Sequence, residues 1–156
     1  MEITEHSIKI ERTAHYYTSD NNLKEAKHIW LLLHGYGQLA SRMIKRFAHN
    51  QTADYYFIAP EAISKHYVQR QPNIVGASWM SKEHRLDEIA DYINYISTVM
   101  DPIIQGMRAG QKLNILGFSQ GTSTMWRYIN YSKYPFNTIV NWAGEFPEDI
   151  KFSSSK

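Results

Sequence analysis

Apolar residues gather into short continuous runs along the chain, and polar segments separate these runs. Such runs are typical of strands that are buried on both faces of a sheet. Four are predicted as strands: "HIWLLL", ended by the glycines of "HGYG" (28–37), "YYFIAP" (55–60), "KLNILGF" (112–118) and "NTIVNWAG" (137–144). Pro60 marks the end of the second strand, because proline cannot donate to a central ladder.

Helical spacing of apolar residues fills the intervals between these strands. Residues 39–50 predict a short amphipathic helix, in which apolar residues lie four positions apart. Another helix is predicted over 120–131. The longest helix is predicted from Ser81 to Pro102, with an apolar face made by Leu86, Ile89, Ile93, Ile96 and Met100.

Three segments lack a clear helical or buried-strand pattern. Residues 7–18 alternate loosely and predict an N-terminal strand or hairpin, and the polar residues 19–27 predict a turn or loop. Residues 61–80 show neither period, so a structureless stretch is predicted there. A stretch of that length within a domain is usually functional or disordered.

The order of these elements predicts the fold class. Strand and helix alternate four times, which favours an α/β fold with a three-layer, doubly wound and mostly parallel sheet. A length of 156 residues predicts one domain over 1–156.

Composition narrows the classes of function. Seventeen basic and fifteen acidic residues give a net charge of +2 with the signs mixed along the chain, so nothing indicates a nucleic-acid or anionic-membrane partner. The chain has no cysteine, which excludes disulfides and thiolate metal sites. Neither a secretory signal nor an apolar run that could span a bilayer is recognisable, and a cytoplasmic protein is expected.

The stretch "ILGFSQGTS" (115–123) carries the most specific chemical signal. It reads as a buried strand, then Gly-x-Ser-x-Gly, then the start of a helix. This is the pattern of a nucleophile elbow, a sharp turn that exposes a serine hydroxyl. Ser119 is therefore a candidate nucleophile, and the backbone amide of Gln120 is a candidate oxyanion donor. The alternative is a glycine-rich turn with a capping serine.

A second oxyanion donor is expected from the turn after an earlier strand. "LLLHGYGQ" (31–38) provides a buried strand followed by a glycine turn at the same edge of the predicted sheet. Tyr36 is the candidate for the backbone N–H, and Gly35 beside it is a candidate for substrate contact. A tight turn without a catalytic role is the alternative.

Four stretches in order, "LLLHGYGQ", "GASWM", "LNILGFSQGTS" and "IVNWAGEFP", resemble the phospholipase/carboxylesterase family of α/β hydrolases. The resemblance implies an α/β-hydrolase fold and hydrolysis of small acyl esters or thioesters through an acyl-serine intermediate, without a cofactor or metal. It places Ser119 on the nucleophile and Tyr36 and Gln120 on the oxyanion positions. Trp79 falls on an aromatic near the substrate site, with core packing as the alternative role.

The chain departs from this family after Ser119. In the family the acid and the histidine follow the serine, on strands beyond "IVNWAG". All seven histidines of this chain lie upstream, at positions 6, 15, 28, 34, 49, 66 and 84. We therefore expect the fold to be truncated after the strand 137–144, without the usual triad acid and base.

Upstream groups are poor substitutes for the missing base. His34 ends the strand beside the one that bears Ser119, but its position in the turn favours a structural role. His66 and His84 are expected to be solvated polar residues. Asp149 is expected to open a surface turn or helix.

Three functional hypotheses follow. The first is a serine esterase seen as a chain that lacks its acid and base. The second is a non-catalytic binding protein on the same scaffold. The third is an enzyme completed by a partner chain. An unpaired apolar strand at 137–144 would also favour self-association, because open sheet edges pair readily.

Overall fold

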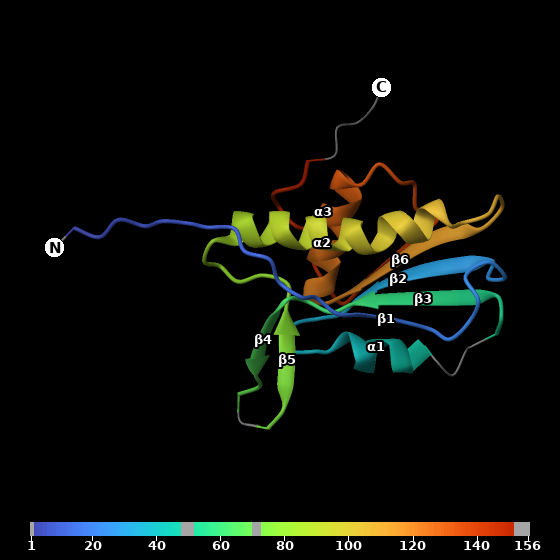
Figure 1. The fold of residues 1–156 in the computed structure, drawn as a ribbon, viewed down its shortest axis with the longest axis horizontal. Coiled ribbons are helices and arrows are strands. Elements are labelled where there is room, and N and C mark those ends of the chain that lie inside the picture. The colour runs from blue at the N-terminus through green and yellow to red at the C-terminus, as the bar shows by residue number, and fades with distance from the viewer. Residues whose placement is uncertain (1, 48–51, 70–72, 152–156) are drawn as a thin grey trace.

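The central sheet has five strands in the order β1-β3-β2-β6-β7 (Figure 1). The computed structural model describes residues 2–47, 52–69 and 73–151. Neighbouring strands run parallel except β1, which is antiparallel to β3. The strands of this sheet are β1 (Tyr16–Thr18), β2 (His28–Leu33), β3 (Tyr55–Pro60), β6 (Lys112–Phe118) and β7 (Thr138–Trp142).

Helices cover both faces of this sheet and make three layers (Figure 1). Helix α1 (Ala40–Phe47) lies on one face, and helices α2 (Arg85–Gln105) and α3 (Gln120–Tyr131) lie on the other. The three-layer, doubly wound and mostly parallel sheet expected from the sequence is thus confirmed.

Successive side chains of β2 point to opposite faces of the sheet and so contribute to two hydrophobic cores, one on each face. Ile29, Leu31 and Leu33 pack into the larger core beneath α2 and α3, whereas Leu32 packs into the smaller core beneath α1. All four side chains are fully buried. A central parallel strand must be apolar on both faces, which is why its sequence reads as a continuous run.

The segment 61–80 is not structureless, as the sequence analysis expected. It contains a second, two-stranded sheet of β4 (Ser64–Tyr67) and antiparallel β5 (Val75–Ser78), which form a hairpin. Figure 1 shows this hairpin standing out from the body beside α1. Its strands are short and mostly polar or small, so they lack the apolar signal by which buried strands are recognised.

Helix α2 also differs from the prediction at both ends. It begins at Arg85 and not at Ser81. It continues past Pro102 to Gln105, because the packing of Ile103 and Ile104 against the core outweighs the hydrogen bond that proline cannot make. Leu86, assigned to the apolar face, is exposed, whereas Tyr92 and Val99 are buried.

The N-terminal prediction was too long. Within 7–18 only Tyr16–Thr18 forms a strand, and the residues before it extend away from the body (Figure 1).

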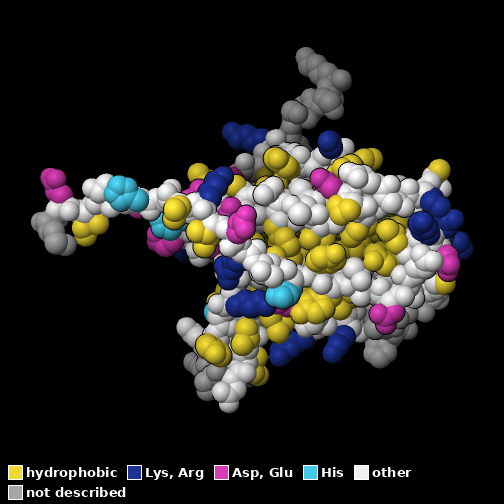
Figure 2. Space-filling model, in the orientation of Figure 1, with side chains coloured by type: hydrophobic (Ala, Val, Ile, Leu, Met, Phe, Trp, Pro, Cys, Tyr) yellow, Lys and Arg dark blue, Asp and Glu magenta, His cyan; other side chains and the backbone are white. Residues whose placement is uncertain are grey.

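Strand β7 forms one edge of the described sheet. It pairs only with β6, and the side chains of Ile139 and Trp142 are exposed. Figure 2 shows the surface of the opposite side, where hydrophobic side chains gather between α2 and the sheet. Within the described residues, no helix has both the length and the apolar character to cross a membrane.

Candidate active site

Ser119 lies in the turn between β6 and α3 in a strained backbone conformation. Its φ is 52° and its ψ is −120°, a combination that residues other than glycine rarely adopt. Gly117 and Gly121 permit this turn. A Cβ atom on Gly117 would lie 2.6 Å from the carbonyl oxygen of Gly121, and one on Gly121 would collide with the end of β2. The sharp strand-to-helix turn expected from the motif is therefore present.

The glycine turn after β2 lies directly against Ser119. A Cβ atom on Gly35 would lie 3.1 Å from the Cβ of Ser119 and 3.1 Å from the ring of Phe118. The two loops meet because β2 and β6 are parallel neighbours, with Leu33 in register with Gly117. The carboxyl ends of such strands lie at one edge of the sheet, where α/β proteins bind ligands.

The backbone amides of Tyr36 and Gln120 flank this meeting point. Neither makes a hydrogen bond within the described part of the chain. For Gln120 this follows from its place at the start of α3, since the first amides of a helix have no partner in the helix. The Tyr36 side chain points outward, is 63% exposed and stacks on His66 with ring centroids 4.8 Å apart.

The Gln120 side chain binds the last residue of β5 and the two residues that follow it. Its amide nitrogen donates to the Ser78 hydroxyl at 3.1 Å and to the Met80 carbonyl at 2.9 Å, and its oxygen accepts from the Trp79 amide at 3.0 Å. The indole of Trp79 donates to the His34 carbonyl at 2.8 Å. That ring is 3% exposed and packs in the larger core, so contact between Trp79 and a substrate stays a prediction.

His34 has no ring nitrogen to offer to Ser119. Its Nε2 accepts a hydrogen bond from the Ala62 amide at 3.1 Å, so the ring proton lies on Nδ1, which donates to the Gly35 carbonyl at 2.8 Å. Burial lowers the pKa of His34, against the opposing effect of that bond to Gly35. The ring is therefore neutral and holds the turn in place.

No other described histidine reaches the serine hydroxyl. Ser119 Oγ makes no hydrogen bond within the described chain. His66 lies in β4, against Tyr36, and His84 caps α2 and faces Glu5 at 3.3 Å. His49 lies outside the described residues.

Asp149 is held in an ion pair with two arginines. The guanidinium of Arg127 donates to both carboxylate oxygens, at 2.6 and 2.8 Å, and Arg85 donates at 2.8 Å. The Arg127 hydrogen bond lowers the pKa of Asp149 to about 2. This residue joins the segment after β7 to α2 and α3, in a surface turn as expected.

A cavity of about 280 Å³ opens beside the elbow on the α1 face. It lies within one residue of both Ser119 and Tyr36 along the chain, because Phe118 and Gly37 contribute to its wall. The lining residues are Gly37, Gln38, Arg42, Met43, Arg46, Phe47, Phe118 and Trp142.

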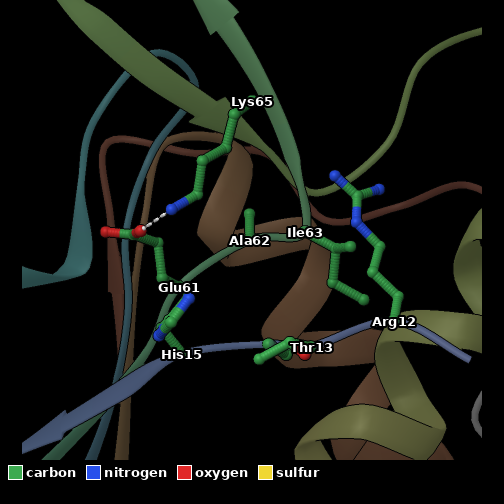
Figure 3. A pocket seen from close by; sticks show the side chains of 8 residues that line it. Arg12, Thr13, His15, Glu61, Ala62, Ile63 and Lys65 are labelled. Atoms are coloured by element: carbon green, nitrogen blue, oxygen red, sulfur yellow. Dashed lines mark hydrogen bonds and ion pairs between the residues drawn. The ribbon is translucent and has the colours of Figure 1, made fainter.

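A second cavity of about 230 Å³ lies between the N-terminal segment and the end of β3 (Figure 3). Its wall includes the buried carboxylate of Glu61, which accepts from Lys65 at 2.5 Å and from the Ala40 amide at 3.2 Å. Both carboxylate oxygens are engaged, so Glu61 anchors the N-terminus of α1. No group of three metal-binding side chains occurs among the described residues.

Sequence reasoning missed the contribution of the end of the hairpin and the residues after it. The stretch "GASWM" predicts only an aromatic near the substrate site, yet Ser78 and Met80 hold the Gln120 side chain. Gly76 was the available signal, since an isolated glycine in a strand often marks close backbone approach.

Comparisons with known proteins identify the family of the chain and proteins that share its fold. A model of the phospholipase/carboxylesterase family matches residues 18–156. No curated protein sequence matches the chain.

Solved structures share the fold at low sequence identity. A phospholipase/carboxylesterase from Dyadobacter fermentans superposes with a TM-score of 0.63 at 20% identity, over 88% of this chain and 63% of that one. Acyl-protein thioesterase 2 from Zea mays gives 0.57 at 18% identity, over 87% and 64%. Esterase PE8 gives 0.57 at 22% identity, over 86% and 66%. The chain thus spans less than two thirds of the length of each of these three proteins.

Proposed function

Because the chain belongs to the phospholipase/carboxylesterase family, we propose that it carries the nucleophile and oxyanion hole of a serine hydrolase acting on carboxylic esters or thioesters. One observation carries this proposal. Ser119, strained at φ 52°, lies so close to the Gly35 turn that a Cβ atom on Gly35 would come within 3.1 Å of its Cβ. The Tyr36 and Gln120 amides, which follow these two residues, make no hydrogen bond within the described chain. We further propose that the chain forms one hydrolase domain over 1–156.

The proposed reaction begins when Ser119 Oγ attacks the acyl carbon. The Oγ–carbon bond forms, the carbonyl oxygen takes up negative charge, and the Tyr36 and Gln120 amides donate to it. Collapse breaks the bond to the leaving alcohol or thiol, which takes up the serine proton. Water then hydrolyses the acyl-serine to a carboxylic acid and restores the hydroxyl. Two oxyanion donors in a water-poor site are typically worth several kcal/mol, about 2.7–4 for each.

Proton transfer requires a base from outside the described residues. A serine hydroxyl without a base is a weak nucleophile at neutral pH, and no described imidazole is bonded to Ser119. We propose that a further polypeptide segment or a partner chain supplies the base. A chain without it would retain only the slow reaction that an oxyanion hole and binding support.

The cavity beside the elbow is the proposed acyl pocket. Its aromatic wall of Phe47, Phe118 and Trp142 suits a small apolar acyl group. Gly35 is the proposed point of closest substrate approach, because a side chain there would fill the space against Ser119. Nucleic-acid partners are not part of the proposal, and a cytoplasmic location remains a prediction.

A non-catalytic binding protein is the alternative function. Within the described residues the Ser119 hydroxyl makes no hydrogen bond, which favours this alternative, since a working triad would bond that oxygen. Such a protein would bind acyl esters in the same pocket without turning them over.

We also propose that the chain self-associates through β7. Among the described residues this strand pairs on one side only, and it exposes Ile139 and Trp142. An open apolar edge is a template for pairing with a second chain.

Covalent labelling with an alkyl fluorophosphonate tests the proposed chemistry. The probe phosphonylates an activated serine, and its phosphoryl oxygen needs the same amide donors. Labelling of the folded chain that is lost in Ser119→Ala supports a serine hydrolase, with Ser123→Ala as the matched control in the same helix. A folded chain that is not labelled, but that binds a non-hydrolysable acyl ether by calorimetry, is the result expected of the binding protein.

A further inference from the structure

Strand β5 is hydrogen bonded to the loop that carries Tyr36. The Gly37 amide donates to the Ala77 carbonyl at 2.9 Å, and the Ala77 amide donates to the Gln38 carbonyl at 3.1 Å. These two bonds form an isolated antiparallel bridge between Gln38 and Ala77. The hairpin therefore adds a short backbone ladder to the loop immediately after the proposed oxyanion donor.

Gly76 makes this ladder possible by its lack of a side chain. A Cβ atom there would lie 2.5, 2.6 and 2.8 Å from the oxygen, Cα and carbonyl carbon of Gly37. Real Cβ atoms do not approach backbone so closely, so either the hairpin or the loop would have to move. The contact fixes the separation between β5 and the Tyr36 loop.

Residues that continue from β5 hold the other side of the site. Ser78, Trp79 and Met80 bind the side chain of Gln120, whose backbone amide is the second proposed donor. Trp79 also binds the carbonyl of His34, at the base of the Tyr36 loop. The segment 76–80 thus contacts both loops that would form the oxyanion hole, although it contains neither donor.

We infer that the segment 76–80 positions the oxyanion hole, with Gly76 and Ser78 as positioning residues. Gly76 fixes the position of the loop that carries the Tyr36 amide, and Ser78 fixes the position of the Gln120 side chain. The inference rests on the proposed function, and it extends that function to Gly76 and Ser78, neither of which is proposed to contact the serine or the substrate. The Gln120 side chain takes part as an anchor for its own backbone amide.

The consequence is chemical rather than structural. An oxyanion hole acts on the charge that develops in the transition state, so a displaced amide slows bond formation and leaves ground-state binding unchanged. Loss of the contacts made by residues 76–80 should lower the maximal labelling rate. The probe concentration that gives half of the maximal rate should stay unchanged.

The test measures saturation kinetics of fluorophosphonate labelling in Gly76→Ala and Ser78→Ala. Gly76→Ala is expected to lower the maximal rate about tenfold or more, and Ser78→Ala about fivefold, as for one lost hydrogen bond. Half-saturation should stay within about twofold. Tyr67→Ser is the matched control, because Tyr67 lies exposed in the same hairpin, opposite Val75, and it should label like the wild type.

Amide hydrogen exchange decides the outcome independently of the chemistry. The Gly37 amide should be protected in the wild type and Ser78→Ala, and released in Gly76→Ala, with melting temperatures checked for each protein. Equal maximal rates in all variants, or a Gly37 amide that exchanges freely in the wild type, would overturn the inference. If the wild type is not labelled at all, the chain lacks the base that the proposed function assigns to another segment or chain. Exchange of the Gly37 amide then decides the inference: protection lost in Gly76→Ala supports the positioning contact, and equal exchange in both proteins refutes it.

Discussion

Gly121 packs directly against the carbonyl oxygen of Leu33, with no room between them for a Cβ atom. Helix α3 therefore begins in contact with the end of β2, and this contact brings the elbow to the Gly35 turn. The second glycine of the motif is required by packing between two elements as well as by the sharp turn.

Substitution Gly121→Ala should destabilise the protein by about 1–3 kcal/mol or more, because the new methyl group would overlap backbone that cannot move aside. Urea unfolding measures the loss. Asn130→Ala, at an exposed position of the same helix, is the control and should change stability by less than about 0.5 kcal/mol. Equal stability of Gly121→Ala and the wild type would contradict the observed contact.

Asp149→Asn should cost about 1–2 kcal/mol at pH 7, since it weakens charge-assisted bonds to the buried guanidinium of Arg127. The loss is modest because the carboxylate is 40% exposed and its charge is screened by water. Glu148→Gln is the neighbouring control.

The same ion pair sets a pH dependence. The pKa of Asp149 in the folded chain is lowered to about 2, below its unfolded value, so its stabilisation is present above about pH 4 and is lost as pH falls towards 2. The difference between the wild type and Asp149→Asn in chemical denaturation should shrink over this range. A difference that stays constant down to pH 2 would argue against the pair.

His34 predicts a second pH dependence, at higher pH. Burial lowers the pKa of His34 in the folded chain below its ordinary value of 6.5. At pH values between the folded and the unfolded pKa, the unfolded chain therefore takes up a proton that the folded chain does not. Stability should therefore fall as pH drops below about 6.5. His34→Gln should show a smaller fall between pH 7.5 and 5.5 in urea titrations, whereas His6→Gln, in the exposed N-terminal segment, should match the wild type.

The proposed association through β7 predicts the effect of Ile139→Lys. A charge on an edge strand opposes pairing with another chain, so sedimentation velocity should show a shift from dimers or larger species to monomer. Tyr131→Lys, which places a lysine at an exposed position of α3, should leave the wild-type distribution unchanged. A wild-type chain that is monomeric throughout the concentration series would refute the association.

The elbow was predictable because its determinants are local. Gly117, Ser119 and Gly121 constrain five consecutive residues, and the apolar strand before them fixes the direction of the turn. Strands β2, β3 and β6 were equally clear, since burial on both faces requires an uninterrupted apolar run. Strand β7 carries a similar run although it lies at the edge of the described sheet with most of its residues exposed.

The hairpin and the end of α2 were not predictable in this way. Ala77 and Gly76 owe their conformation to Gln38 and Gly37, some forty residues earlier, and no local pattern encodes that pairing. Pro102 is a local signal for a helix end, but packing of Ile103 and Ile104 overrode it. The partners of Asp149 likewise come from two distant helices.

The bonds around the segment 76–80 also bear on the order of folding. The contacts of Trp79 with His34 and Gln120 close chain loops of 45 and 41 residues, and each closure costs entropy before it gains a bond. Such non-local contacts slow the folding of a domain. The elbow can form as soon as β6 and α3 pack together. The Tyr36 and Gln120 amides reach their final positions only when the loop after β2, the segment 76–80 and the elbow have packed together.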